Sequence, residues 1–448
     1  SSHFGSSQGK DRQKPRRAMK VAIIGAGAAG SACAWRLLTG KGVEGLSVSL
    51  FEMGRGAGGR AGTRHVGTCR GLHVNHGAPF FHVPVADTQV KPLLSALLAS
   101  GHLKPWAGKH GVINAESGAL SAGGASRGET ALGGEDFARY IGHPGMSSLA
   151  GGCLELAREA SQGGLAVQFG TRVKELRPRK SGDSILGWEL FDKDAKHLGI
   201  FDWVVVAGAT PALARWRAGF KEEPPVFAAA EASGSDLLRG LLARLDSPLK
   251  YDQTHVVLLA WDVTQDSSMV KSLQCLPFEV AHVTDDEALA KVLVQSMGPQ
   301  YAVVALHSTG SFARRHKKVM GSESYVSVAN GVTGSVDGER AVGLELLGAF
   351  ERLLRKLGAP GMSPPTWGPT LHRWGAAFPE PDLGGLASEA WALPAERLSF
   401  AGDFLAPPSG CVAAALRSGL AAGDALLRQA QGLPVEAPSL GAQQRSSL

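Results

Sequence analysis

The sequence predicts an α/β protein in which a domain built on a parallel sheet is interrupted by an inserted α+β domain. Three observations lead to this prediction. An apolar run at 20–24 precedes three glycines and a helical segment, and a second apolar run at 47–51 completes a strand–helix–strand unit. Further strand patterns occur in the middle of the chain and again near its end, at 398–401. The segments between them are long enough to form a second domain.

The first glycines lie where the chain turns from strand to helix. Gly25 permits a tight turn, Gly27 lets the backbone approach a pyrophosphate, and Gly30 lets the helix pack closely on the strand. The helical pattern at 31–38 ends at Gly40, a usual helix terminator. This order of strand, glycines and helix indicates a phosphate-binding turn.

Two further features complete a nucleotide site. The N–H groups of Ala28 and Ala29 lie at the positive end of the helix, which attracts phosphate. Glu52 directly follows the strand at 47–51, with Met53 after it, and is placed to accept hydrogen bonds from ribose hydroxyls. The chain therefore begins with a Rossmann-like dinucleotide-binding unit.

Other strand patterns divide the rest of the chain. They lie at 166–169, 188–191, 203–207, 254–261, 302–307 and 325–328, and the strand at 398–401 precedes a helix over about 412–428. Because elements of the dinucleotide fold come early, in the middle and last, we expect that domain to be discontinuous. The expected bounds are 19–84, 148–212 and 362–430 for the dinucleotide domain, 85–147 and 213–361 for the inserted substrate domain, 1–18 for a disordered basic leader and 431–448 for a disordered tail.

Composition argues against several classes of function. The 448 residues carry a formal net charge of +6, part of which lies in the basic segment before residue 21. The nearly neutral body gives no support to a nucleic-acid partner. No run approaches the roughly 18 apolar residues of a membrane span. Five scattered cysteines without a CxxC motif indicate reduced thiols, so we expect a soluble intracellular protein.

The segment 1–18 is basic and nearly free of acidic residues. Three interpretations stay open: the remnant of an organelle transit peptide, the remnant of a tag, or a disordered arm. The first would place the protein in a plastid (chloroplast), which is the compartment we expect on this ground alone.

A second glycine motif follows the ribose acid. In Gly58-Gly59-Arg60, two glycines give access to the backbone and a guanidinium can neutralise a pyrophosphate oxygen. At this offset from Glu52, the motif resembles that of the FAD-containing amine oxidase superfamily. The resemblance implies noncovalently bound FAD in a glutathione-reductase-like, Rossmann-like domain.

Further segments narrow the resemblance to the renalase-like members of that superfamily. They are 74–81, where Asn75 replaces the family's usual aspartate, 139–149, 187–188, 201–207, 305–308 and 372–374. They occur in the same order as in renalase-like proteins, from about residue 19 to 430, with insertions near 107–135 and 213–245. As a set these matches are specific, whereas each short segment alone is not.

The C-terminal motif comprises Gly402-Asp403 and the start of the helix at 412. In the family, the aspartate binds a hydroxyl of FAD and the helix N-terminus faces the flavin, where its dipole stabilises the anionic reduced form. The family's Val-Glu-Gly-Ala reads Val-Ala-Ala-Ala at 412–415. Since backbone N–H groups bind the flavin, we expect binding to persist and the tuning of the flavin to differ.

Together, the motifs and the resemblance give a set of expected site residues. The cofactor-binding residues are Gly25, Gly27, Ala28, Ala29, Gly30, Glu52, Met53, Gly59, Arg60, His76, Gly77, Ala78, Val173, Gly402, Asp403, Cys411, Val412 and Ala413. The candidate catalytic residues are Trp374, His372 and His307. For these three, packing in the core is the open alternative. We expect no metal site, because the positions of His73 and His76 on a strand would direct them to opposite faces.

Three functions remain open. The resemblance implies an FAD-dependent oxidoreductase that accepts hydride from a reduced nicotinamide dinucleotide, NAD(P)H or an isomer of it. A flavin amine oxidase acting on a small amine is the second, although only four tyrosines are available for the usual aromatic cage and none lies at 404–411. The third is a subunit of a larger assembly, with partner proteins, that keeps FAD without turnover.

Overall fold

The computed structural model describes residues 19–122, 136–246, 250–297, 300–321, 335–380, 387–405 and 410–439. Its first sheet has the strand order β10-β2-β1-β14-β21-β20. The strands are β1 (Lys20–Ile24), β2 (Ser47–Phe51), β10 (Leu165–Gln168), β14 (Trp203–Val206), β20 (Ala390–Leu393) and β21 (Leu398–Ala401). All pair in parallel except β20 with β21. The carboxyl ends of the central strands therefore meet at one edge of the sheet, where open α/β sheets bind their ligands.

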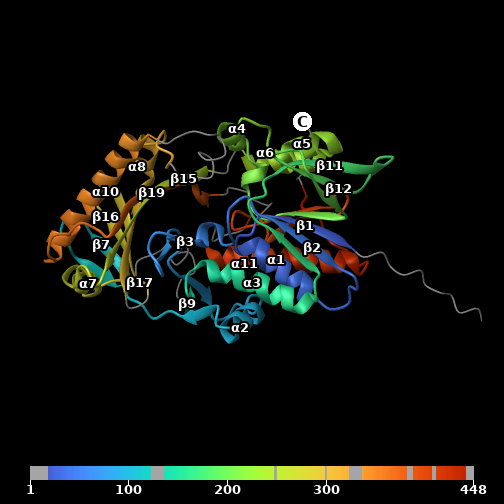
Figure 1. The fold of residues 1–448 in the computed structure, drawn as a ribbon. Helices are drawn as coiled ribbons and strands as arrows, with labels where there is room; N and C mark the ends of the chain where they lie inside the picture. Colours follow the sequence, from blue (N-terminus) through green and yellow to red (C-terminus); the bar gives the residue numbers. More distant parts are fainter. Residues whose placement is uncertain are drawn as a thin grey trace, which may run out of the picture.

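Three helices cover one face of this sheet: α1 (Ala28–Thr39), α3 (Ser147–Ser161) and α11 (Val412–Ala430) (Figure 1). The first and last come from opposite ends of the chain, yet α1 and α11 pack closely. A β-carbon on Gly419 would lie 2.1 Å from the Ala29 carbonyl oxygen, so this contact requires glycine. The close packing brings the start of α11 beside the start of α1.

The opposite face packs against a three-stranded antiparallel sheet and two helices. These elements are β11 (Val173–Ser181), β12 (Ser184–Asp192), β13 (His197–Phe201), α5 (Pro225–Ser233) and α6 (Asp236–Asp246). The 3₁₀ turn η3 (Thr210–Ala212) and the short helix α4 (Arg215–Phe220) lead from β14 into α5. The first sheet is thus the middle of three layers, with α1, α3 and α11 on one face and the three-stranded sheet with α5 and α6 on the other.

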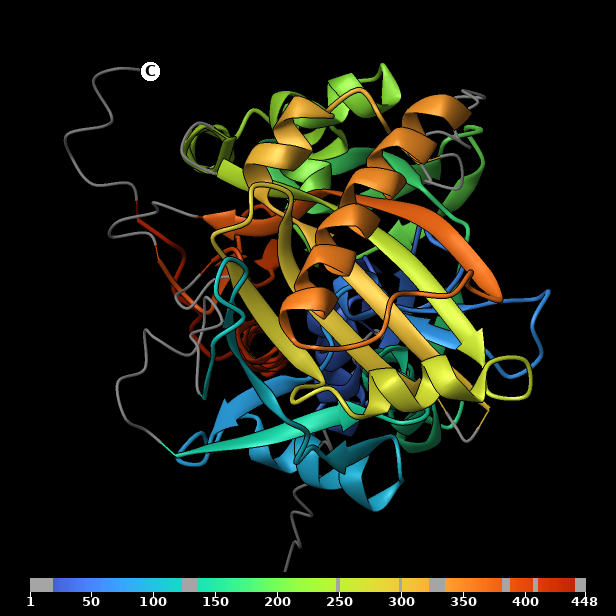
Figure 2. The same cartoon turned by 90° about the vertical axis from the view of Figure 1, so that its left-hand side faces the viewer.

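A second, seven-stranded sheet has the order β19-β15-β18-β17-β16-β7-β8. Its strands are β7 (His110–Asn114), β8 (Leu120–Ala122), β15 (Lys250–Asp262), β16 (Val280–Thr284), β17 (Leu289–Met297), β18 (Tyr301–Ser308) and β19 (Trp367–Glu380). One face is covered by α7 (Ser267–Gln274), α8 (Gly310–Arg315) and α10 (Val336–Lys356), which runs across it in Figure 2. The other face lies toward the first sheet and toward a small apolar cluster from residues 66–74.

Several small elements complete the fold, and most of them pack with α1, α3 and α11 in a further apolar core. They are the 3₁₀ turn η1 (Gly59–Ala61), the pair β3 (Thr63–His65) and β4 (His73–Asn75), the sheet β5 (Phe81–Pro84), β9 (Phe137–Gly142) and β6 (Leu103–Pro105), and α2 (Lys91–Ala99). Among the described residues, no helix combines the length and apolar character needed to cross a bilayer.

The structure revises part of the domain division expected from sequence. Residues 367–380 form β19, which pairs with β15 in the seven-stranded sheet and not with the first sheet, because an extended β15 offers it a full-length partner. Residues 215–246 form α4, α5 and α6, and the last two bury their leucines and alanines in the first core. Residues 433–439, assigned to a disordered tail, contact α11 through the bond from Arg428 to the Pro434 carbonyl (3.2 Å). The expectations for 1–18, 325–328 and 440–448 fall outside the described residues.

Candidate active site

A cavity of about 780 Å³ lies between the two sheets. The carboxyl ends of β1, β2, β14 and β21 line one part of it, and the inner face of the seven-stranded sheet lines the other. This volume is at the upper end of the roughly 300–1,000 Å³ usual for small-molecule sites. One continuous cavity therefore joins the glycine-rich turns to the second sheet.

The turn from β1 to α1 has the geometry that its glycines predict. Gly25 has a φ of 109°, and its amide donates to the Phe51 carbonyl (2.8 Å). A β-carbon on Gly30 would lie 1.9 Å from the Gly25 carbonyl oxygen, so Gly30 packs the helix onto the turn. Gly27 begins α1 without a side-chain cap, and Ala28 and Ala29 line the cavity. The positive end of α1 thus faces the cavity with backbone N–H groups.

The second glycine motif packs directly on the first. Gly58 donates to the Ala26 carbonyl (2.9 Å), and Gly27 and Gly58 form a parallel bridge. Glu52 ties the same loops together, because its carboxylate accepts from the amides of Ala26 (2.8 Å) and Gly54 (2.7 Å). The two motifs therefore form one backbone surface beside a carboxylate.

The C-terminal motif completes this part of the cavity. The Arg60 guanidinium forms an ion pair with Asp403 (2.5 Å) and donates to the Ala377 carbonyl (3.0 Å). The amide of Gly402 donates to the Ser418 hydroxyl (2.7 Å), which fixes this turn on α11. Cys411 caps α11 by accepting from the Ala414 amide (3.3 Å), and burial raises the pKa of its thiol.

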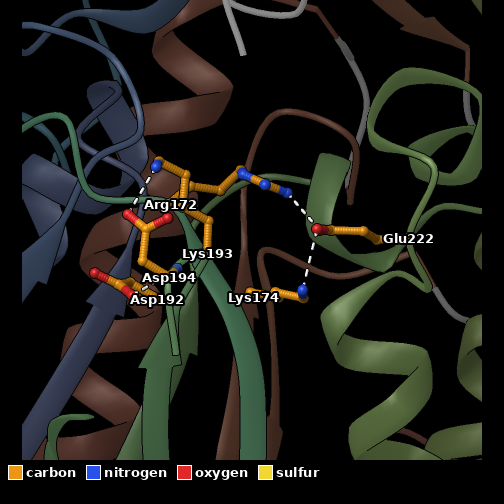
Figure 3. Close-up of polar contacts among 6 residues, drawn as sticks. All are labelled: Arg172, Lys174, Asp192, Lys193, Asp194 and Glu222. Atoms are coloured by element: carbon orange, nitrogen blue, oxygen red, sulfur yellow. Dashed lines mark hydrogen bonds and ion pairs between the residues drawn. The ribbon is translucent and has the colours of Figure 1, made fainter. Parts of the chain in front are cut away.

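A buried guanidinium that the sequence did not point to, that of Arg172, also lines the cavity, and Figure 3 shows its contact with Glu222. Arg172 pairs with Glu222 (2.6 Å), which also pairs with Lys174 (3.1 Å). The Arg172 guanidinium lies 4.5 Å from the Phe220 ring centroid and 5.7 Å from that of Trp216. The buried Nε1 of Trp216, which also lines the cavity, has no hydrogen-bond partner among the described residues.

Residues 23–97 match the family model described as an NAD(P)-binding Rossmann-like domain. The chain contains a Rossmann-like domain. No curated protein matches the chain in sequence.

Solved structures resemble the chain in fold. A redesigned triple mutant of putrescine oxidase is 14% identical with a TM-score of 0.54, and the match covers 92% of this chain and 99% of that one. Wild-type putrescine oxidase bound to putrescine is 14% identical with a TM-score of 0.54, covering 91% and 99%. A Diels-Alderase of the pyrroindomycin pathway is 15% identical with a TM-score of 0.47, and the chain spans 66% of its length. At these identities, the similarity to putrescine oxidase establishes a common fold.

Most of the residues expected at the site from sequence line the cavity. They are Gly25, Gly27, Ala28, Ala29, Glu52, Met53, Gly59, Arg60, Gly77, Ala78, Val173, His307, Trp374, Gly402, Asp403, Cys411 and Val412. Four do not: Gly30, His76, His372 and Ala413. For Gly30 this follows from its role in packing the helix.

The aromatic candidates form a cluster of their own. His76 stacks on Trp374 with ring centroids 5.2 Å apart, and His372 contacts both rings. The Trp374 indole N–H donates to the His76 carbonyl (3.0 Å), so this hydrogen bond holds β19 to the loop after β4. Burial lowers the pKa of His372 well below its ordinary value and that of His76 to about 4. Both rings are neutral near pH 7, and the structure gives them a packing role.

The inner face of the second sheet adds charged and titratable groups that sequence motifs did not indicate. His282 and Lys291 on that face line the cavity together with the predicted His307, and Arg215, at the start of α4, lines the cavity from outside the sheet. A lysine within the apolar run 288–294 was the one signal available in the sequence. Among the described residues, no group of three or more His, Cys, Asp or Glu side chains is placed to hold a metal ion.

Proposed function

We propose that this chain is an FAD-dependent oxidoreductase of the renalase-like kind, which oxidises a reduced nicotinamide dinucleotide or an isomer of it. The observation that carries the proposal is the single cavity that runs from the two glycine motifs to the inner face of the seven-stranded sheet. Such a cavity can hold a dinucleotide cofactor at one end and a substrate against it at the other.

The residues at the first end fit FAD. The surface formed by Gly27 and Gly58 has no side chains, and a β-carbon on Gly27 would point into open space, so phosphates can approach the backbone there. Glu52 lies at the end of β2, where a carboxylate can accept bonds from ribose hydroxyls. Arg60 lies beside the motif with a guanidinium that can neutralise phosphate.

The chemistry that FAD supplies when bound is two-electron acceptance of a hydride. This transfer needs no protein nucleophile and no metal. The residues of the chain therefore have to bind the substrate, orient it and exclude water from the site. The rings of Phe80, Trp374 and Phe378 line the cavity and can exclude water there. The groups that can hold the substrate lie on the opposite wall, on β16, β17 and β18.

The alternative substrate is a small amine, which the common fold with putrescine oxidase brings into consideration. Among the described residues that line the cavity, the carboxylates are Glu52 and Asp403. Glu52 is bonded to two amides and Asp403 to Arg60, so neither is directed to a cationic substrate on the second sheet. The ammonium group of Lys291 on that sheet favours an anionic substrate such as a dinucleotide.

The test is an anaerobic stopped-flow experiment on the purified flavin-loaded protein. NADH, NADPH and their isomers are mixed with the protein in turn, and the oxidised flavin band at about 450 nm is followed. Rapid loss of the band with a dinucleotide supports the proposal, and putrescine serves as the amine control. Loss of the band with putrescine alone supports the amine oxidase. A protein that retains FAD and reacts with none of them contradicts the proposed activity and the amine oxidase alike, and favours a structural flavin in an assembly subunit.

A further inference from the structure

Three titratable side chains form a row across the seven-stranded sheet. The strand register places His282 of β16 directly opposite Lys291 of β17, and Lys291 directly opposite His307 of β18. The row continues through Val256 of β15 to His372 of β19. Directly opposite residues share one face of a sheet, and the first three line the cavity. The row therefore faces the substrate end of the site.

Lys291 is the positive charge of this row. Within the described residues, no carboxylate or other hydrogen-bond acceptor contacts its Nζ, and the Phe378 ring centroid is 5.9 Å away. Burial lowers the pKa of Lys291 to about 8, so the side chain is still mostly protonated at pH 7. A half-buried cation without a counter-ion is costly, and an anion that enters the cavity would remove that cost.

The two histidines provide neutral hydrogen-bonding groups on either side. His307 is 4% exposed, and its Nε2 has no partner among the described residues. Burial lowers the pKa of His307 well below its ordinary value and that of His282 to about 4. Each ring is therefore neutral near pH 7, with one N–H that can donate. A buried, unpartnered imidazole nitrogen beside an unpaired ammonium is the arrangement expected of an oxyanion site.

We propose that Lys291, flanked by His282 and His307, binds an oxyanion of the substrate, either a carboxylate or a phosphate. The assignment rests on the proposed function, because it names the part of the substrate that this wall of the cavity recognises. It makes Lys291 a substrate-binding residue, and the charge of its ammonium group selects anionic over cationic molecules.

The test measures anion binding and not turnover. Inorganic phosphate and benzoate are titrated by calorimetry into the flavin-loaded protein at pH 7, for the wild type and for Lys291→Met and Lys291→Arg. Lys271→Met, on the exposed side of α7, is the matched control. We expect K291M to weaken binding at least tenfold with unchanged flavin content, and K291R and K271M to retain it. Binding of phosphate alone identifies a phosphate site, and binding of benzoate alone identifies a carboxylate site.

A pH series supplies a second readout. The titratable groups beside Lys291 are His282 and His307 on the adjacent strands, and beyond them His110 on β7 faces His282 and His76 faces His307. Because the pKa of Lys291 is about 8 and benzoate keeps its charge throughout, benzoate binding should decline between pH 7 and 9 in the wild type and stay constant in K291R. Equal anion affinity in wild type and K291M, or no anion binding by the loaded wild type, overturns the assignment.

The proposed function and this assignment can fail separately. If dinucleotides bleach the flavin and K291M leaves their KM unchanged, the assignment is wrong and the function stands. If no dinucleotide bleaches the flavin while phosphate or benzoate binding depends on Lys291, the anion site stands and the dinucleotide function is wrong.

Discussion

Arg60 and Asp403 are 343 residues apart in sequence and form an ion pair with 2.5 Å between Nη2 and Oδ1. The Asp403 side chain is 5% exposed and that of Arg60 is 39% exposed. The pair joins the second glycine motif to the turn before α11, and both residues line the cavity.

Removal of Arg60 should destabilise the protein and release flavin. In Arg60→Ala, the buried carboxylate of Asp403 keeps its charge and loses its partner, at a cost of about 2 kcal/mol, below that of a fully buried pair because Arg60 is partly exposed. Urea unfolding gives the free energy, and the ratio of absorbance of flavin to that of protein gives occupancy. The control is the pair Arg36–Asp424, whose carboxylate is 45% exposed where that of Asp403 is 5% exposed, so Arg36→Ala should cost under about 1 kcal/mol. If R60A/D403N is no more stable than R60A, the buried charge is not the cause.

Substitution of Gly30 should lower the stability of the protein, whereas substitution of Gly27 in the same turn should lower its flavin content. A β-carbon on Gly30 would lie 1.9 Å from the Gly25 carbonyl oxygen, so Gly30→Ala forces a backbone shift and should lower stability by about 3 kcal/mol. A β-carbon on Gly27 meets nothing within 4 Å, so Gly27→Ala should unfold at the wild-type urea concentration. Because that β-carbon enters the proposed phosphate-binding surface, G27A should lose flavin. A G27A protein with full flavin content would contradict the proposed phosphate site.

The buried indoles of Trp216 and Trp203 allow the contribution of an indole hydrogen bond to stability to be compared. Trp203 donates to the Ser399 hydroxyl (2.9 Å), whereas the N–H of Trp216 has no partner among the described residues. Trp203→Phe should therefore cost about 1 kcal/mol more than Trp216→Phe in urea unfolding of the flavin-free protein. The flavin-to-protein ratio should fall in W216F alone if this N–H serves the bound nucleotide. Equal losses of stability in the two variants would show that packing, and not the hydrogen bond, decides the cost.

Stability should fall as the pH is lowered from 7 to 4. Burial lowers the pKa values of His76 and His282 to about 4, so between their ordinary value and 4 the unfolded chain binds protons that the folded chain does not. Each such histidine decreases the free energy of unfolding by up to about 1.4 kcal/mol per pH unit in this window. Urea unfolding at pH 7, 6 and 5 measures the slope. His282→Gln should make it shallower, and His197→Gln, at an exposed position on β13, should not.

Short-range patterns in the sequence were enough to predict the Rossmann-like domain. The strand at 47–51 and the start of α11 at 412 agree with the structure, and the glycines of both motifs lie where their spacing requires. Such features depend on residues a few positions apart, whose conformational preferences and backbone sterics are fixed by the chain itself.

Short-range patterns could not predict which side chains from distant segments of the chain come together, and the tertiary structure decided this. Strand register alone places His282, Lys291 and His307 side by side, because these residues come from three different strands and no spacing in the sequence sets which of them lie opposite. The ion pair of Arg60 with Asp403 likewise depends on the packing of α11 beside α1. The sequence by itself determined the Rossmann-like unit with its two glycine motifs, whereas long-range pairing and packing determined which charged groups face the cavity, since these contacts exist only once the sheets have assembled.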